Sequence, residues 1–253
     1  MTYPSKRTGR RFGSALAIAV AMLLGAGQIA SAQDKPSAAV PAPPAKDYKD
    51  ERALTLLKRM SDTLAGAKTL GFKVRGIVPT PAPTGQFVSL FASSSVTMQR
   101  PDKLFVAARG DLFPSDIYYD GKTVTVIGAD RRFYTQRDAS GSAMETLMQD
   151  MASGSDATGP FLDLLAADPY AVLTKDFTSA LWVGQSTVGG VATDHLAFTA
   201  EGLDWEIWIG ARDKLPRLMV VSYRSGPRQP TFTVELSGWK LDAAVPPKTF
   251  AAA

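Results

Sequence analysis

The residues best suited to chemistry lie in the stretch DHLAFTAEGLDWEIWI, residues 194 to 209, which contains His195. This is the only histidine of the chain, and the chain has no cysteine. Because side chains alternate along a strand, Asp194 points away from His195 and cannot orient it as a Ser-His-Asp triad requires. The segment GQSTV, residues 184 to 188, is an incomplete nucleophile elbow, since valine replaces the second glycine. We therefore expect His195 to be a partly buried residue or one at the rim of a sheet.

Two carboxylates, Asp204 and Glu206, are predicted to share a strand face with Trp208. Paired carboxylates carry out glycoside hydrolysis, but such positions on one strand face are more often part of a solvated exterior. A cofactor-free hydrolase that uses His195 or this pair is therefore a hypothesis that we rank behind two others. We expect no metal and no cofactor, because a zinc site takes several His or Cys ligands and the sequence has no EF-hand loop.

The opposite face of that strand is apolar and carries Trp205, Ile207 and Ile209. Apolar residues of other predicted strands add to this face. Together they provide more apolar surface than the turns and edges of a sheet require. These further residues are Phe87, Phe91, Leu104, Val106, Leu218 and Val220. The surface can line a cavity for an apolar ligand or belong to a filled core, and alternation alone does not identify the concave face.

A second apolar surface is predicted in mid-chain, on a short helix that a capping-box pair precedes. Its residues recur at helical spacing and are Met144, Leu147, Met148 and Met151. Methionine adapts to irregular apolar ligands, and it also fills awkward spaces in cores. We expect either a lid over a ligand, which the glycine-containing sequence after the helix favours, or ordinary core packing.

The first 32 residues are predicted to be a secretory signal peptide. Lys6, Arg7, Arg10 and Arg11 precede a long apolar run, and small residues at 30 to 32 provide a cleavage site. We expect Sec-dependent export and removal of residues 1–32. The result would be a periplasmic protein that does not span the membrane.

After the leader, residues 33–46 are rich in Pro and Ala, which predicts a flexible or polyproline linker. Residues 47–253 are then expected to form one β-rich domain that is large enough to bury its own core. An amphipathic helix is predicted at the start of this domain. It is indicated by Ala53, Leu57, Met60 and Leu64, which recur at three- and four-residue spacing.

Charge and cysteine content exclude several classes of function. The leader holds four of the 28 Lys and Arg residues and none of the 24 Asp and Glu, so its removal leaves a formally neutral protein. Such a protein lacks the overall attraction to phosphates that nucleic acid binding uses, and we exclude that class of partner. Without cysteine there is no disulfide, no thiol nucleophile and no lipidated cysteine, so we expect a soluble protein and not a lipoprotein.

The rest of the domain is dominated by alternation of apolar and polar residues, which predicts long antiparallel hairpin strands. Asp120-Gly121 and Gly189-Gly190 mark tight turns between them. The predicted order is a helix, about five strands, two short helical stretches and about five more strands. This order predicts a mainly β, α+β fold, in which one antiparallel sheet curls and helices cover its concave face.

Several segments together resemble a known family. RPDKLFVAARGDLFPSDIYYDGKTVTVIGADRRFYTQ, residues 100 to 136, is similar to the central hairpins of the LolA and LolB superfamily of bacterial lipoprotein carriers. SSSVTMQRPDKL, YYDGKTVTV, DHLAFTAEGLDWEIWI, LPRLMVVSY and SGWKLD resemble the predicted periplasmic family named for domain of unknown function 2092. The resemblance implies a LolA-like half-open barrel around an apolar cavity suited to acyl chains, without catalytic residues.

The leading hypothesis is a non-enzymatic periplasmic binding or carrier protein for an apolar small molecule, a lipid or an acylated protein. The expected ligand-binding residues are Phe87, Phe91, Val106, Met144, Leu147, Met148, Met151, Trp205, Ile207 and Ile209. The alternative is an envelope interaction or sensing module with a filled core, which meets another envelope protein. The cofactor-free hydrolase is the third hypothesis.

Overall fold

A computed structural model describes residues 47–253, apart from residues 112, 140–159, 225–229 and 253. The elements of this part follow one another along the chain with short connections between most of the strands. They are α1 (Glu51–Gly66), β1 (Thr69–Pro81), β2 (Phe87–Gln99), β3 (Lys103–Gly110), β4 (Ser115–Tyr119), β5 (Thr123–Gly128), β6 (Tyr134–Asp138), η1 (Pro160–Leu165), α3 (Pro169–Leu173), β7 (Phe177–Val188), β8 (Val191–Ala200), β9 (Leu203–Gly210), β10 (Pro216–Tyr223), β11 (Thr231–Leu241) and η2 (Pro247–Phe250).

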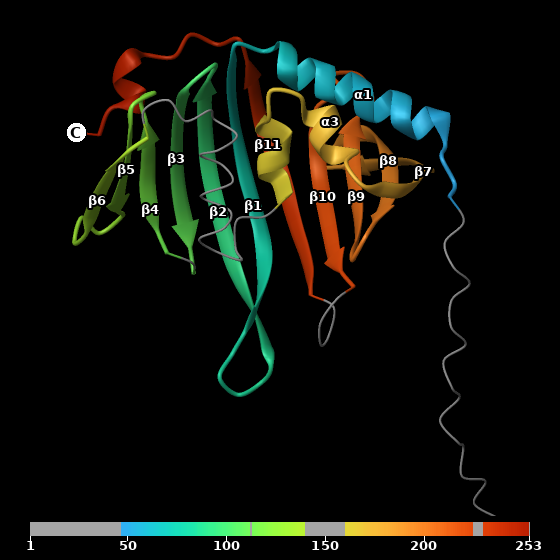
Figure 1. The fold of residues 1–253 in the computed structure, drawn as a ribbon, viewed down its shortest axis with the longest axis horizontal. Coiled ribbons are helices and arrows are strands. Elements are labelled where there is room, and N and C mark those ends of the chain that lie inside the picture. Colours follow the sequence, from blue (N-terminus) through green and yellow to red (C-terminus); the bar gives the residue numbers. More distant parts are fainter. Residues whose placement is uncertain (1–46, 112, 140–159, 225–229, 253) are drawn as a thin grey trace, which may run out of the picture. The chain divides into compact units, whose positions relative to one another are not determined.

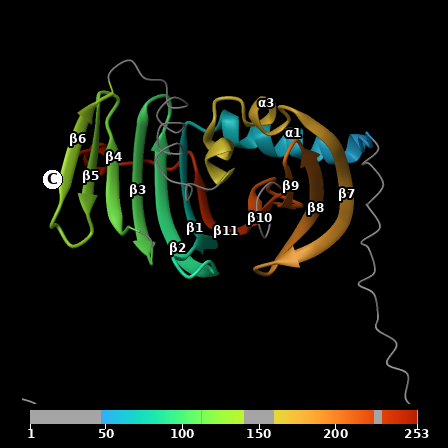
Figure 2. The same cartoon turned by 60° about the horizontal axis from the view of Figure 1, so that its bottom comes forward.

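The described strands form one eleven-stranded antiparallel sheet with the order β6-β5-β4-β3-β2-β1-β11-β10-β9-β8-β7. Two meanders, β1 to β6 and β7 to β11, are joined in the middle of the sheet by the pairing of β1 with β11. The sheet curves and does not close, so β6 and β7 are its two edges (Figures 1 and 2). The predicted mainly β fold with a curved antiparallel sheet is confirmed, with six strands before the short helices and five after them.

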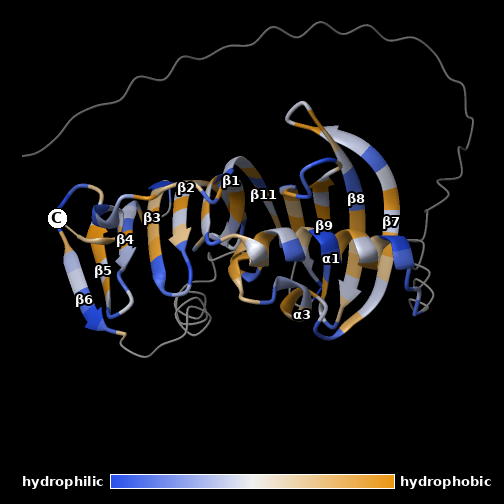
Figure 3. Ribbon diagram, turned by 90° about the horizontal axis from the view of Figure 1, so that it is seen from above, coloured by the Kyte–Doolittle hydropathy of each residue, from blue (hydrophilic) through white to orange (hydrophobic). Residues whose placement is uncertain are grey.

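Helix α1 covers one half of the sheet. The Asp50 carboxylate accepts a hydrogen bond of 2.8 Å from the Arg52 amide and caps the helix. The helix face towards the sheet is apolar apart from Ser61 and consists of Ala53, Leu56, Leu57, Met60, Ser61 and Leu64. The expected amphipathic helix is therefore confirmed. Seen from above, α1 and α3 lie together on one side of the strands β7 to β9 (Figure 3).

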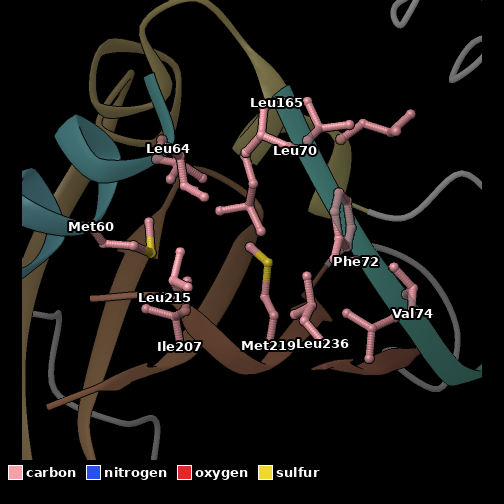
Figure 4. Close-up of a cluster of buried hydrophobic side chains, with 14 of the residues drawn as sticks. Met60, Leu64, Leu70, Phe72, Val74, Leu165, Ile207, Leu215, Met219 and Leu236 are labelled. Carbon is pink, nitrogen blue, oxygen red and sulfur yellow. The ribbon is translucent and has the colours of Figure 1, made fainter. Parts of the chain in front are cut away.

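The space between α1 and the strands β7 to β11 is a filled core. Met60 and Leu64 of α1 approach Ile207, Met219 and other inward side chains of the sheet (Figure 4). Trp205, Ile207 and Ile209 are all at most 5% exposed in this core. This half of the sheet therefore agrees with the filled-core interpretation of their face, because α1 occupies the concave side.

Both ends of the described chain contact the sheet. Residues Tyr48 to Asp50 run along the edge strand β7, where Ala180 donates to the Tyr48 carbonyl and accepts from the Asp50 amide. At the other end of the chain, η2 packs against β3 and Phe250 is 2% exposed. Of the helices in the described residues, none has both the length and the apolar character that a membrane span needs.

Candidate functional site

The half of the sheet that α1 leaves uncovered carries its inward side chains in rows that cross the strands β1 to β5. Each row consists of residues that the strand register places directly opposite one another on neighbouring strands. The rows differ in the size of their side chains. The large-residue row is Leu70, Met98, Leu104, Tyr119 and Val124. The middle row is Phe72, Val96, Val106, Ile117 and Val126. The small-residue row is Val74, Ser94, Ala108, Ser115 and Gly128.

A cavity of about 400 Å³ lies over the middle and small-residue rows. Small side chains leave this space, because close packing requires volume that Ser94, Ala108 and Ser115 do not supply. The cavity is lined by Val74, Gly76, Val78, Ala92, Ser93, Ser94, Val96, Leu104, Val106, Ala108, Arg109, Phe113, Ser115, Ile117, Val126, Phe161, Leu162, Leu165, Phe232 and Val234. Most of these side chains are apolar, and Arg109 is the one charged residue among the lining residues that the structure describes.

The roof of the cavity is η1, which contributes Phe161, Leu162 and Leu165. Leu165 is fully buried between the sheet and the helices. The Arg100 guanidinium, in the turn between β2 and β3, donates a hydrogen bond of 3.0 Å to the Ala166 carbonyl just after η1. This bond holds the end of η1 against the sheet, so the roof is fixed relative to the strands that form the floor.

The two ends of the cavity differ in exposure. At one end the large-residue row closes it, since Leu70, Met98 and Leu104 are fully buried. Tyr119 of the same row is 1% exposed, and this burial raises the pKa of its hydroxyl above the ordinary value. At the other end, beside the loop between β3 and β4, Phe113 is 69% exposed.

Polar groups gather at that exposed end. The Arg109 guanidinium is 2.9 Å from the Asp116 carboxylate and donates to the carbonyls of Ala108 and Ser115 at 2.7 and 3.2 Å. About half of the Arg109 side chain is exposed. The cavity thus has an apolar interior and one polar end, a common arrangement in sites for small apolar ligands.

The predicted ligand-binding residues fall into four groups. Val106 lines the cavity, as expected for a cavity residue. Trp205, Ile207 and Ile209 also face inward, but they lie in the filled core beneath α1 and do not line the cavity. Met144 and the other three residues of the mid-chain apolar surface, Leu147, Met148 and Met151, lie outside the described residues, so the expected lid stays a prediction.

The fourth group, Phe87 and Phe91, lies on the wrong face for a cavity residue. The pairing of β1 with β2 runs without a shift over its whole length, so Phe91 is on the face opposite Ala92 and Ser94. Phe91 is accordingly 43% exposed. Leu218 and Val220 were grouped with them and are likewise on the outer face, since their neighbours Met219 and Val221 are the buried residues of β10.

The residues considered for catalysis form a cluster on the outer face of β8 and β9. His195 Nε2 is 2.7 Å from Glu206 Oε2, and the imidazole stacks on the Trp208 ring with a centroid distance of 3.8 Å. Asp204 accepts a 2.9 Å hydrogen bond from the Thr199 hydroxyl. The sequence analysis did not predict the pairing of His195 with Glu206. The short Glu201-Gly202 turn could have predicted it, because this turn fixes the register of β8 on β9.

Asp194 points to the inner side of the sheet, as alternation predicts. Its carboxylate accepts a 3.2 Å hydrogen bond from Trp182 Nε1 and is 3.7 Å from the Arg52 guanidinium, which lies over the Trp182 ring. It cannot act on His195, and the His195 cluster does not contribute to the cavity lining. The cluster therefore lies outside the cavity, and the Glu206 side chain in it is 40% exposed to water.

Solved structures with a similar backbone path share little sequence identity with this chain. LprF from Mycobacterium bovis shares 17% identity with a TM-score of 0.47, over 79% of this chain and 98% of that chain. A LolA superfamily protein from Nitrosomonas europaea shares 10% identity with a TM-score of 0.36, over 79% and 97%. MucB in the Pseudomonas aeruginosa MucA/MucB complex shares 15% identity with a TM-score of 0.44, over 80% and 61%. Because all three TM-scores are below 0.5, no ligand or partner of this chain follows from them.

Sequence comparison identifies the family. No protein of curated function matches the chain significantly. In contrast, the model of the family described as predicted periplasmic protein, domain of unknown function 2092, matches residues 53–253. This match covers most of the chain and confirms the resemblance that its segments indicate. The chain belongs to the DUF2092 family of predicted periplasmic proteins.

Proposed function

We propose that this protein is a non-enzymatic periplasmic binding protein, which holds an apolar ligand in the cavity between η1 and the strands β1 to β5 and β11. The observation that carries the proposal is the cavity of about 400 Å³ with its mostly apolar lining. This volume lies within the range of pockets that bind small molecules, about 300 to 1,000 Å³. Each methylene group that a ligand buries there contributes about 0.8 kcal/mol.

The energetics of the cavity favour an occupant. Water in the cavity is held poorly, because it needs two to four polar partners and the middle row offers none. An apolar ligand that replaces this water removes apolar lining surface from contact with water, which is favourable by about 25 cal/mol per Å².

A second candidate function is an envelope interaction module. The observation in its favour is the edge strand β6, in which every residue from Tyr134 to Asp138 is exposed. An exposed edge strand can pair with an extended segment of another protein. A hydrolase has less support, because His195 and Glu206 lie on the outer face and away from the cavity.

The proposal is tested by protein purified from its own periplasm. Native mass spectrometry is expected to show a co-purified apolar compound, and an apolar fluorescent probe is expected to bind with one site per chain. The variant Ile117→Asn places an amide in the cavity and is expected to weaken probe binding at least tenfold, because a polar group is left without a partner there.

The matched control is Phe91→Asn, which makes the same kind of change on the outer face of the sheet, where the side chain is 43% exposed. Probe affinity is expected to be unchanged in this variant. Circular dichroism melts of both variants verify that they fold. Absence of both a co-purified compound and a bound probe would refute the proposal, and so would equal losses of affinity in the two folded variants.

A further inference from the structure

We infer that the hairpin tip of β1 and β2 is a docking edge for an extended, uncharged segment of another protein, which adds as a strand beside residues 87–90 of β2. Binding at this edge uses the backbone of β2 and is independent of any ligand in the cavity. The added strand continues the line of β3, which ends at Gly110.

The hairpin projects beyond the strands on either side of it (Figure 1). The pairing of β1 with β11 stops at Ile77, and the pairing of β2 with β3 stops at Ala92. Between β1 and β2 themselves, the pairing continues to Pro81 and Phe87. Residues 78–91 therefore form a two-stranded ribbon, and none of the other described strands pairs with either of its edges.

Hydrogen bonds at both ends of the ribbon show which backbone groups point outward. In the turn, the Ala82 amide donates to the Gln86 carbonyl at 2.8 Å, across the ribbon. Where the ribbon joins the sheet, the Phe91 carbonyl accepts from the Asp111 amide, and the Phe91 amide donates to the Asp111 carboxylate, both at 2.8 Å. Because backbone groups alternate in direction along a strand, the even-numbered residues of the ribbon bond across it and the odd-numbered residues face its edges.

The two edges of the ribbon differ in their capacity to pair. On the β11 side, the outward residues of β1 are Pro79 and Pro81, which have no amide hydrogen to donate. On the β3 side, the outward residues of β2 are Phe87 and Ser89, which each have one. Proline protects sheet edges from unwanted pairing, and β2 contains none. The β2 side of the ribbon is therefore open to another strand.

The two edge strands of the sheet are better protected than this side of the ribbon. Residues 48–50 pair with part of β7. Strand β6 carries Arg137 and Asp138 among its five residues, and charged side chains limit pairing at an edge. Among the described edges, the β2 side of the ribbon is the one that lacks a covering segment, a proline and a charge.

The side chains around the open edge determine which kind of segment fits it. Residues 76–99 contain no Asp, Glu, Lys or Arg. An added strand lies with its side chains beside Phe87 and Ser89 on one face and beside Val88 and Leu90 on the other. Apolar and β-branched side chains pack well in these positions, whereas a charged one finds no partner. The segment is short, because four residues of β2 extend over about 13 Å at about 3.3 Å per residue.

The first experiment adds a synthetic hexapeptide of alternating threonine and valine, acetylated and amidated at its ends, to the purified protein. Hydrogen exchange of the Phe87 and Ser89 amides, measured by NMR, is expected to slow at least tenfold at saturation. Exchange at Val88 and Leu90 is expected to slow far less, because these amides already point to β1. The same peptide with an N-methyl group on every residue has no backbone donor and is expected not to bind.

Two substitutions at one position separate the backbone from the side chain. Ser89→Pro removes an amide hydrogen from the open edge and is expected to weaken peptide affinity at least tenfold. Ser89→Ala changes the same side chain but keeps the amide, and its affinity is expected to stay within twofold of the natural protein. Circular dichroism melts verify that both variants fold. If Ser89→Pro fails to fold, Phe87→Pro at the other outward position replaces it.

Four outcomes overturn the inference. Equal peptide affinity of the folded proline and alanine variants, or binding of the N-methylated peptide, would show that the backbone edge is not the site. Absence of protection at Phe87 and Ser89 at millimolar peptide would have the same meaning. A dimer in analytical ultracentrifugation that Ser89→Pro dissociates would identify a second copy of the chain as the occupant. Binding to phosphatidylcholine vesicles without binding of the peptide would assign the ribbon to a membrane surface.

Discussion

At the scale of single residues, Ser61 is out of place in the apolar face of α1. Its side chain is 1% exposed, and its hydroxyl has no hydrogen-bond partner among the described residues. A buried polar group without a partner costs about 1 to 3 kcal/mol, and serine is also a poorer helix former than alanine. The residue therefore lowers the stability of the helix that fills one half of the sheet.

The variant Ser61→Ala is expected to be more stable than the natural protein by about 1 kcal/mol, because it removes the unpaired hydroxyl and raises helix propensity. Urea unfolding followed by circular dichroism measures the change. Ser89→Ala, at an exposed position of β2, serves as the control and is expected to change the free energy of unfolding by less than about 0.5 kcal/mol. A loss of stability in Ser61→Ala would show that the hydroxyl is satisfied in solution.

Alternation predicted which residues of one strand share a face, but it could not identify the concave face. It separated Asp194 from His195 correctly and grouped Trp205, Ile207 and Ile209, which are buried together. It failed for Phe87 and Phe91, because the inward face of β2 carries Val88 and Leu90 and the outer face is also partly apolar. When both faces of a curved sheet contain large apolar residues, only the long-range register decides between them.

At the scale of the elements, Asp50 couples α1 to the edge strand β7. One carboxylate oxygen accepts from the Arg52 amide at 2.8 Å, and the other accepts from the Trp182 amide at 3.3 Å. The backbone of the same segment pairs with Ala180 through two hydrogen bonds of 2.7 and 3.0 Å. The start of the helix thereby satisfies part of an edge that would otherwise be open to another strand.

Asp50→Ala is expected to lower the free energy of unfolding by about 1 to 2 kcal/mol, because it removes the helix cap and the bond to β7 together. Asp50→Asn keeps an oxygen acceptor and is expected to recover most of this loss. Asp62→Ala removes an exposed carboxylate that pairs with Lys58 in the same helix, and an effect below about 0.5 kcal/mol is expected. Urea unfolding of the three variants tests this, and equal losses for Asp50→Ala and Asp62→Ala would contradict the coupling.

Short sequence patterns were sufficient to predict most helices, strands and turns. They did not predict which strands pair with each other in the sheet. The capped helix, the Asp120-Gly121 turn and the Gly189-Gly190 turn each follow from a few adjacent residues, and all three are present. The pairing of β1 with β11 joins residues about 160 positions apart, such as Arg75 and Glu235, and no local pattern encodes it. The cavity depends on this pairing, because Val234 of β11 and Val74 of β1 both line it.

At the scale of the whole described unit, one concave face is divided between two uses. Helix α1 fills the part above β7 to β11, whereas η1 leaves a space above β1 to β5. The sequence favoured neither the filled core nor the cavity, and the structure contains both. The reason is physical: the helix is long enough to cover about half of an eleven-stranded sheet, and the small-residue row lies in the other half.

This division predicts where a ligand acts. At one hundred times its dissociation constant, an apolar ligand is expected to stabilise the protein by about 2.7 kcal/mol, which corresponds to a melting temperature about 5 to 10 °C higher. Hydrogen exchange measured by mass spectrometry is expected to slow in β1 to β4 and in η1, because these elements line the cavity. Exchange in β8 and β9 below α1 is expected to slow far less at short labelling times, since their core is already filled.

The Ile117→Asn variant should show neither the higher melting temperature nor the slower exchange. Protection concentrated in β8 and β9 would locate the ligand on the wrong half of the sheet and would contradict the cavity as the binding site.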